Sequence, residues 1–194
     1  MKMRLFFFAC SMFSILVVSA QKDNTLIGEN SDGGAFGSVF IEMSTINGQF
    51  GTDVGGGGAA VFNGFFLGGY GQGTRFPTFS DGGGNTYELH FNHGGLWMGY
   101  SPLRTAVIHP YTSVKLGWGK VRLNPDDEGL DRISDQHFTL VPEAGVELNL
   151  TNSLHIVFSA AYRVVNGLEN LPQGLDQDSF NSLMGKITFR IGSF

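Results

Sequence analysis

The chain of 194 residues has one cysteine and no apolar segment long enough for a membrane-spanning helix. Its longest apolar run, Leu5 to Val18, has 14 residues and contains Cys10. A helix needs about 20 apolar residues to cross a bilayer, so this run is too short. No second run of this length follows it. The sequence therefore excludes a membrane protein built from helices.

Residues 1–20 are expected to form a secretory signal peptide. Met1-Lys2-Met3-Arg4 is a short cationic start, the apolar run follows it, and Val18-Ser19-Ala20 offers the small residues of a cleavage site. Cleavage there would start the mature chain at Gln21 and remove Cys10. We therefore expect a mature protein without disulfides.

Charge is scarce as well, with 15% charged residues and a net charge of −5. Because no basic cluster occurs, we expect no nucleic-acid partner. The chain has 29 glycines and 18 phenylalanines but no Gly-X-Y repeat, which excludes collagen, and so many aromatics argue against disorder. Glycines and aromatics in short alternating segments are typical of a tightly curved sheet.

The alternation is clearest between residues 138 and 165. One parity is apolar and includes Leu140, Ala144, Val146, Leu148, Leu150, Leu154, Ile156, Phe158, Ala160, Tyr162 and Val164. The other parity is polar and includes Glu143, Glu147, Asn149, His155, Ser159 and Arg163. A strand sends alternate side chains to opposite faces of a sheet, so this segment predicts a hairpin with one apolar and one polar face.

Eight segments of this kind predict the strands of a barrel. They are residues 35–46, 50–62, 65–75, 86–100, 109–123, 137–150, 154–166 and 180–192. Most reach the ~9–11 residues with which a tilted strand crosses a bilayer. Together with the signal peptide they predict an all-β fold, an eight-stranded antiparallel up-and-down transmembrane β-barrel over residues 35–194. Residues 21–34 are polar and aperiodic, and are expected to be a flexible lead.

The short connections predict the strand register. Asn47-Gly48 and Asn63-Gly64 are typical of two-residue type I′ turns. They place Glu42 opposite Asp53 and Phe62 opposite Phe65. A three-residue turn at 151–153 keeps the apolar faces of its two strands together.

The lengths of the connections predict the orientation. Long polar connections at 76–85, 124–136 and 167–179 alternate with shorter ones at 63–64, 101–108 and 151–153. Outer-membrane barrels have short periplasmic turns and longer outer loops. We therefore expect a protein of the bacterial outer membrane, in contact with the lipid bilayer and with both chain ends in the periplasm. Trp97, Trp118, Tyr100, Tyr111 and Tyr162 are candidate anchors at the membrane surfaces.

Several motifs carry a resemblance to known proteins. Ile187-Thr188-Phe189-Arg190-Ile191-Gly192 resembles the closing strand of bacterial outer-membrane barrels, which ends on an aromatic residue; here Phe194 has the parity of the inward residues. The runs 55–63, 65–71, 94–100, 142–150 and 161–167 are similar to small uncharacterised eight-stranded outer-membrane β-barrel proteins of Gram-negative bacteria. The resemblance implies the outer-membrane assembly machinery as a partner during insertion, and it implies no reaction and no external ligand.

The polar parity predicts a network of charges in the lumen. Its acids are Glu42, Asp53, Glu88, Glu143 and Glu147, and its bases are Lys115, Arg163, Lys186 and Arg190. The interior of an eight-stranded barrel is just wide enough for side chains, and unpaired buried charges are costly. We therefore expect a plugged lumen in which Lys186 or Arg190 lies between Glu42 and Asp53. A narrow pore for protons or ions is the alternative.

No metal or cofactor is expected, because the five histidines lack zinc-site spacing and the acidic stretch 124–136 lacks that of an EF-hand. The leading interpretation is a non-enzymatic protein that stabilises the envelope or interacts at the cell surface. One alternative is a membrane-embedded lipid hydrolase or acyltransferase that uses His90 or His155, which share the predicted lumen parity, with Ser159 and an acid. A soluble barrel of lipocalin type, with an apolar interior, is another.

Overall fold

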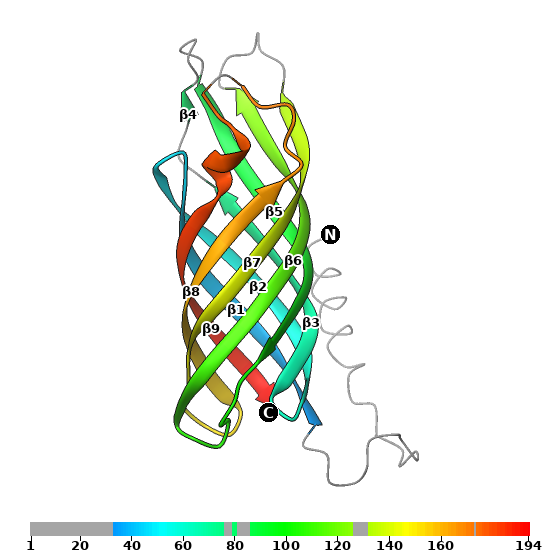
Figure 1. Ribbon diagram of the computed structural model, residues 1–194, viewed down its shortest axis with the longest axis vertical. Helices are drawn as coiled ribbons and strands as arrows, with labels where there is room; N and C mark the ends of the chain where they lie inside the picture. Colours follow the sequence, from blue (N-terminus) through cyan, green and yellow to red (C-terminus); the bar gives the residue numbers. More distant parts are fainter. Residues whose placement is uncertain (1–32, 76–78, 81–85, 126–131, 173) are drawn as a thin grey trace, which may run out of the picture. The chain divides into compact units, whose positions relative to one another are not determined.

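The computed structural model describes residues 33–75, 79–80, 86–125, 132–172 and 174–194. These residues form a closed antiparallel β-barrel (Figure 1). The expected signal peptide (1–20) and the lead from 21 to 32 lie outside the described residues. The first strand begins at Gly33, two residues earlier than the sequence suggests.

Eight long strands close the barrel. They are β1 (Gly33–Ile46), β2 (Gln49–Phe62), β3 (Phe65–Arg75), β5 (Thr86–Tyr100), β6 (Ile108–Pro125), β7 (Ile133–Asn149), β8 (Leu154–Asn166) and β9 (Ser182–Ser193). Each pairs with its neighbours in the chain, β3 pairs with β5, and β9 pairs with β1 to complete the circle. The two-residue strand β4 (Phe79–Ser80) only extends the edge of β5. The prediction of an eight-stranded antiparallel up-and-down barrel is confirmed.

The turns set the register that the sequence predicts. Asn47, Gly48, Asn63 and Gly64 all have positive φ, between 50° and 83°, as type I′ turns require. Glu42 lies opposite Asp53, and Phe62 opposite Phe65. At the third turn the Leu150 N–H donates to the Leu154 carbonyl over 3.0 Å and encloses residues 151–153.

The connections fall at two ends of the barrel. The end that carries the 47–48 turn and the β3–β5, β6–β7 and β8–β9 connections is called the loop end, at the top of Figure 1. The other is the turn end, where the C terminus lies. β6 and β7 run further than predicted, to Pro125 and from Ile133, and residues 126–131 between them are outside the described part. The β8–β9 connection contains a short 3₁₀ helix, η1 (Gln177–Phe180), that the sequence did not predict.

Over most of their length the strands turn apolar side chains outward. The exposed residues include Val39, Ile41, Val54, Leu67, Leu96, Val146, Phe158, Leu183 and Ile191. The inward side chains on the same strands are mostly polar, charged or aromatic, with a few aliphatic ones such as Val61, Val141 and Val157. This distribution is opposite to that of a soluble lipocalin-type barrel. No helix among the described residues is long and apolar enough to cross a membrane.

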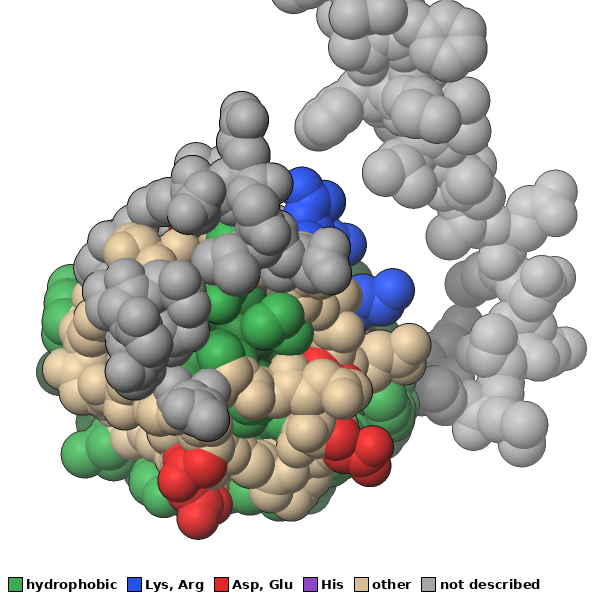
Figure 2. Space-filling view, turned by 90° about the horizontal axis from the view of Figure 1, so that it is seen from above, with side chains coloured by type: hydrophobic (Ala, Val, Ile, Leu, Met, Phe, Trp, Pro, Cys, Tyr) green, Lys and Arg blue, Asp and Glu red, His purple; other side chains and the backbone are tan. Residues whose placement is uncertain are grey.

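The polarity of the wall reverses near the loop end. On β5, Leu89 and Phe91 point inward and are buried, whereas Glu88, His90 and Asn92 take the outward parity. On β6, Val121 and Leu123 point inward, and Lys120 and Arg122 are exposed. With Ile46, Tyr87, Val165, Leu168, Leu175 and Phe180 these inward residues form one apolar cluster. Apolar side chains occupy the middle of the barrel mouth (Figure 2).

This reversal corrects two predictions. Glu88 and His90 were expected in the lumen, but they lie on the outer wall, where their side chains pair at 3.2 Å and Glu88 is 42% exposed. The physical reason is that the long strands continue beyond the apolar part of the wall. There the polar face takes the outside, the arrangement of a wall surrounded by water, and the apolar face fills the interior.

Candidate functional site

The candidate site is a set of eight charged side chains buried in the lumen. They are Glu42 on β1, Asp53 on β2, Lys115 on β6, Glu143 and Glu147 on β7, Arg163 on β8, and Lys186 and Arg190 on β9. Every one is at most 5% exposed. Without Glu88, the four acids equal the four bases in number. The chain places each acid within 4 Å of a base, so the set forms four ion pairs.

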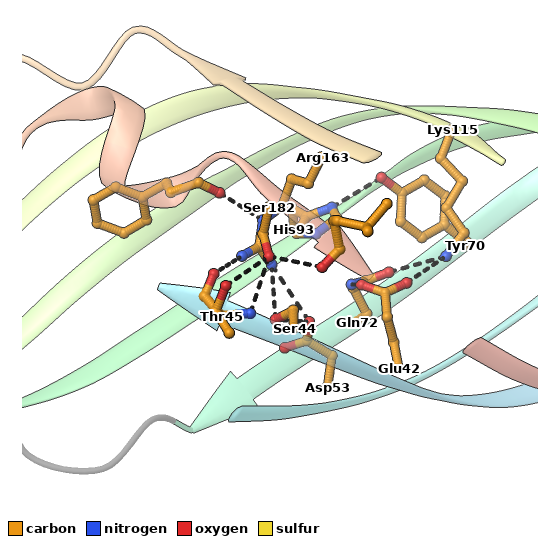
Figure 3. A network of polar contacts seen from close by, with 12 residues as sticks. Glu42, Ser44, Thr45, Asp53, Tyr70, Gln72, His93, Lys115, Arg163 and Ser182 are labelled. Atoms are coloured by element: carbon orange, nitrogen blue, oxygen red, sulfur yellow. Dashed lines mark hydrogen bonds and ion pairs between the residues drawn. The ribbon is translucent and has the colours of Figure 1, made fainter. Parts of the chain in front are cut away.

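The pair nearest the loop end joins Asp53 and Arg163 (Figure 3). The Arg163 Nη1 lies 3.4 Å from the Asp53 Oδ2, which also accepts from the Ser44 hydroxyl at 3.2 Å. The other guanidinium nitrogens donate to backbone carbonyls, Nε to Phe180 at 2.9 Å and Nη2 to Thr45 at 3.2 Å. One buried arginine thus connects β1, β2 and η1 to β8.

The second pair joins Glu42 and Lys115 through an amide. The Lys115 Nζ is 3.9 Å from the Glu42 Oε2. Gln72 bridges them, since its Nε2 donates to the Glu42 Oε1 at 3.2 Å and its Oε1 accepts from Lys115 at 3.0 Å. The ammonium also lies over the Phe40 ring, 3.8 Å from its centroid, which is a favourable cation–π position.

The third pair, Glu143 and Lys186, is completed by hydroxyl groups. The Lys186 ammonium donates to the Glu143 Oε2. Ser113 donates to the same oxygen at 2.9 Å, and Ser159 donates to the Oε1 at 2.6 Å. Both carboxylate oxygens are therefore hydrogen-bonded, which a buried charge requires.

The fourth pair, Glu147 and Arg190, lies near the turn end. The Arg190 Nη1 donates to the Glu147 Oε1 at 2.6 Å. Ser101 donates to the Oε2 at 2.7 Å, and the His155 Nδ1 lies 2.9 Å from the Oε1. The guanidinium rests on the Phe36 ring, 3.8 Å from its centroid.

The pairing differs from the prediction that Lys186 or Arg190 lies between Glu42 and Asp53. Lys186 is indeed the register partner of Glu42, but its ammonium reaches Glu143 on β7. In a narrow lumen a long side chain can reach several strands. Register fixes which Cα atoms are neighbours, and the hydroxyl donors around Glu143 favour the pair that is formed.

Aromatic rings fill the space between the lower ion pairs. Phe36, Phe66 and Trp97 meet edge to face with centroids 5.3–5.5 Å apart, and Phe66 stacks on Tyr111 at 5.9 Å. Glycines on β2 make room for such rings, since a Cβ on Gly55 would lie 2.5 Å from the Phe40 ring. The rings and the paired charges thus lie side by side in the lumen.

The same packing corrects the predicted membrane anchors. Trp97 and Tyr111 are buried inside the barrel, at 0% and 1% exposure. Trp118, Tyr100 and Tyr162 are exposed on the outer wall. Tyr111 shares the parity of the lumenal Lys115, a signal that could have placed it correctly, whereas Trp97 has the parity opposite to Glu88, so the predicted faces of this strand pointed to the wrong side.

Phe194 lies inside the turn end, as its parity predicts. Its ring stacks on His155 with centroids 3.7 Å apart and on Phe36 at 5.7 Å. A cavity of about 590 Å³ opens beside it, lined by residues that include Arg104, Asn149 and Leu150. The C-terminal ring therefore separates this cavity from the fourth ion pair.

The lid, here residues 167–172 and 174–181, lies at the loop end. Phe180 is fully buried in the apolar cluster, and the Asp135 carboxylate accepts from the backbone N–H groups of Glu169 and Asn170. Asp176 caps η1, where the Ser179 hydroxyl and backbone N–H hydrogen bonds lower the pKa of its carboxyl. Contacts at both ends of the lid hold it against the barrel.

The serine, histidine and acidic residues of the enzymatic alternative do not form the triad of an acyl hydrolase. Ser159 donates to Glu143, whereas His155 contacts Glu147, and His90 lies on the outer wall. Ser101 and His155 both contact Glu147, so the carboxylate lies between them. Acyl hydrolases need the imidazole between serine and acid. Within the described ranges, no group of three or more His, Cys, Asp or Glu residues is placed to hold a metal ion.

Comparison with known proteins places the fold. The sequence matches no family model and no curated protein. Neisserial surface protein A superposes with a TM-score of 0.55 at 12% identity, covering 84% of this chain and 97% of that one. The N-terminal β-barrel domain of Pseudomonas aeruginosa OprF gives 0.52 at 13% identity, over 84% of this chain and 98% of that one. The chain thus shares its fold with small eight-stranded outer-membrane β-barrels of Gram-negative bacteria.

Proposed function

We propose that this protein is a non-enzymatic barrel of the bacterial outer membrane, with a plugged lumen and a loop end that interacts outside the cell or stabilises the envelope. The observation that carries the proposal is the lumen, in which four acids and four bases form four buried ion pairs. A set of this kind fills the interior without an uncompensated charge.

The outer wall supports the location. The apolar outward residues of β6 run from Ile108 to Trp118, ten residue steps or about 33 Å at about 3.3 Å per residue. With a strand tilt of about 40° this length corresponds to a height of about 25 Å, the height of the apolar band of outer-membrane barrels. The reversed polarity above Trp118 supports a loop end that stands in water.

The interior supports a closed lumen. The apolar cluster of the loop end, the ion pairs and the aromatic rings follow one another along the barrel, and Phe194 lies across the turn end. An ion would have to separate buried ion pairs, which is costly. A narrow pore requires a rearrangement of these groups.

The fixed lid supports a surface role, because an ordered loop presents the same groups to every partner. One structural neighbour is named as a surface protein, Neisserial surface protein A. We extend that role to this chain only as a proposal.

Location and orientation can be tested in cells. The protein should fractionate with the outer membrane, and unboiled samples should migrate differently from boiled ones on a denaturing gel. Protease added to intact cells should cut in 124–136 or 167–179 and spare 101–108 and 151–153. A soluble periplasmic form, or cleavage only in the second pair of segments, would refute the location or the orientation.

The closed lumen can be tested by conductance. The refolded protein should give no steady ion current in planar bilayers, while the gel shift of the same sample verifies that the barrel is folded. Regular current steps would favour the narrow pore. Release of fatty acid from labelled phospholipid by the same sample would favour the lipid hydrolase.

A further inference from the structure

Basic side chains gather on the outer wall just above the apolar band. Lys120 and Arg122 on β6 and Arg132, directly before β7, are all exposed. Basic side chains lie together at one side of the barrel rim when the loop end is viewed from above (Figure 2). The acid on the adjacent part of β5, Glu88, is already paired with His90 at 3.2 Å. We call Lys120 and Arg122 the basic pair.

The height of the basic pair relative to the band can be worked out along β6. Trp118 is 57% exposed and meets the Phe138 ring edge to face at 5.5 Å, which marks the upper edge of the band. Lys120 and Arg122 follow it by two and four residues on the same outward parity. At the same rise and tilt they lie about 5 and 10 Å higher. Lys120 thus falls within a headgroup layer about 5–7 Å thick, and Arg122 lies just above it, where its long side chain can reach back to the phosphates.

We propose that the basic pair binds the phosphate groups of lipid headgroups in the outer leaflet. A guanidinium offers two parallel N–H donors to a phosphate, and an ammonium adds a point charge. Trp118 below them offers a ring that packs against the start of an acyl chain. The proposal rests on the outer-membrane location proposed above.

The position on the side wall favours a lipid over a soluble anion. The two side chains project from the barrel wall immediately above an exposed tryptophan, where a headgroup stands in a bilayer. Two of the cations that the structure leaves exposed thus lie on one strand, two residues apart, just above the apolar band. The four buried bases of the lumen cannot contribute, because their partners are inside.

Quenching of Trp118 by brominated lipids tests the proposal. The refolded protein is placed in nanodiscs with phosphatidylcholine and phosphatidic acid, one of which is brominated near the headgroup end of its chains. Trp97 is buried in the lumen and gives a constant background. The ratio of the two quenching efficiencies reports how strongly phosphatidic acid is enriched beside Trp118.

The wild type should enrich phosphatidic acid, and each basic residue should contribute about fivefold at low salt. Lys120→Gln and Arg122→Gln should each lower the enrichment by about that factor, and the double variant should abolish it. Lys120→Arg and Arg122→Lys keep the charges and should retain most of it. Arg104→Gln, which removes one positive charge at the turn end, is the matched control and should leave it unchanged. Salt at 1 M should weaken the effect, since it shortens the Debye length to about 3 Å.

The two proposals fail separately in this assay. If neither brominated lipid quenches Trp118, the outer wall is not in the bilayer, and the proposed location is wrong. If both lipids quench it equally, or if the double variant keeps the preference, the barrel is embedded but the basic pair binds no headgroup phosphate.

Discussion

Replacement of Arg163 by methionine should destabilise the barrel more than any other single change in the lumen. Methionine keeps the approximate length of the side chain and removes its charge and donors. Asp53 would be left fully buried with one remaining partner, the Ser44 hydroxyl at 3.2 Å. The carbonyls of Thr45 and Phe180 would each lose a donor as well.

The expected magnitude follows from the stranded charge. Removing one partner of a buried ion pair costs about 3–5 kcal/mol. The upper half of that range is expected, because one hydroxyl cannot replace a guanidinium. With a urea dependence of about 2 kcal/mol per M, the unfolding midpoint should fall by about 2 M.

A double-mutant cycle separates the charge from the packing. Asp53→Asn removes the acid, and Asp53→Asn combined with Arg163→Met should be less destabilised than the sum of the single variants by about 1–3 kcal/mol. Arg163→Lys keeps the charge but loses the fork that reaches both carbonyls, so it should fall between wild type and Arg163→Met. Unfolding is followed by tryptophan fluorescence during urea titration in lipid vesicles.

The reasoning would be refuted by a small effect. If Arg163→Met changes the free energy of unfolding by less than about 1 kcal/mol, or if the cycle shows no coupling, Asp53 is not stabilised by Arg163 in the folded barrel. Water or another group in the lumen would then have to compensate its charge.

Three further changes have defined outcomes. Arg190→Met should cost about 2 kcal/mol, less than Arg163→Met, because Glu147 keeps Ser101 and His155 as partners. Ile191→Val on the outer wall should cost well under 1 kcal/mol in the same urea unfolding assay, and equal effects of the two changes would contradict the lumen pairing. Phe194→Ala removes the ring stacked on His155 and should lower stability by about 1–2 kcal/mol, and an unchanged midpoint would show that this ring does not seal the turn end. Asp176→Ala should speed hydrogen exchange of the lid amides and leave the urea midpoint of the barrel unchanged. Because its hydrogen bonds lower the pKa of Asp176, the cap is present at higher pH and is lost as the pH falls through the lowered pKa. If the variant and the wild type exchange at the same rate at neutral pH, Asp176 does not cap the lid.

The sequence alone determined the strand number, the register and most of the two faces. Because side chains alternate between the two faces of a strand, each strand has only two possible assignments of its parities to the inside and the outside. A two-residue turn such as Asn47-Gly48 sets the register and so links the assignment of one strand to that of the next. Glu42 opposite Asp53 and Phe62 opposite Phe65 follow directly from that rule. The inward parity of Phe194 was also evident, because it continues the alternation of the last strand.

Tertiary structure decided which face looks inward near the loop end. On β5 both parities carry polar groups, since His93 shares the parity of Phe91 and Leu89, and His90 that of Leu96. The alternation shows that the faces differ and does not show which one meets lipid, water or the lumen. That depends on how far the strand extends beyond the apolar band, and this is why Glu88 and His90 were predicted on the wrong side.

Tertiary structure also decided the pairing of the charges and the position of the lid. The register of β1 and β9 makes Lys186 a neighbour of Glu42, yet its ammonium bonds Glu143 on a strand two positions away around the barrel. Long side chains in a narrow lumen choose among several partners, and the choice depends on the hydroxyls and rings around each one. Closure of the barrel brings these groups together, and local sequence patterns, which describe one strand and its turn at a time, carry no information about contacts across the lumen.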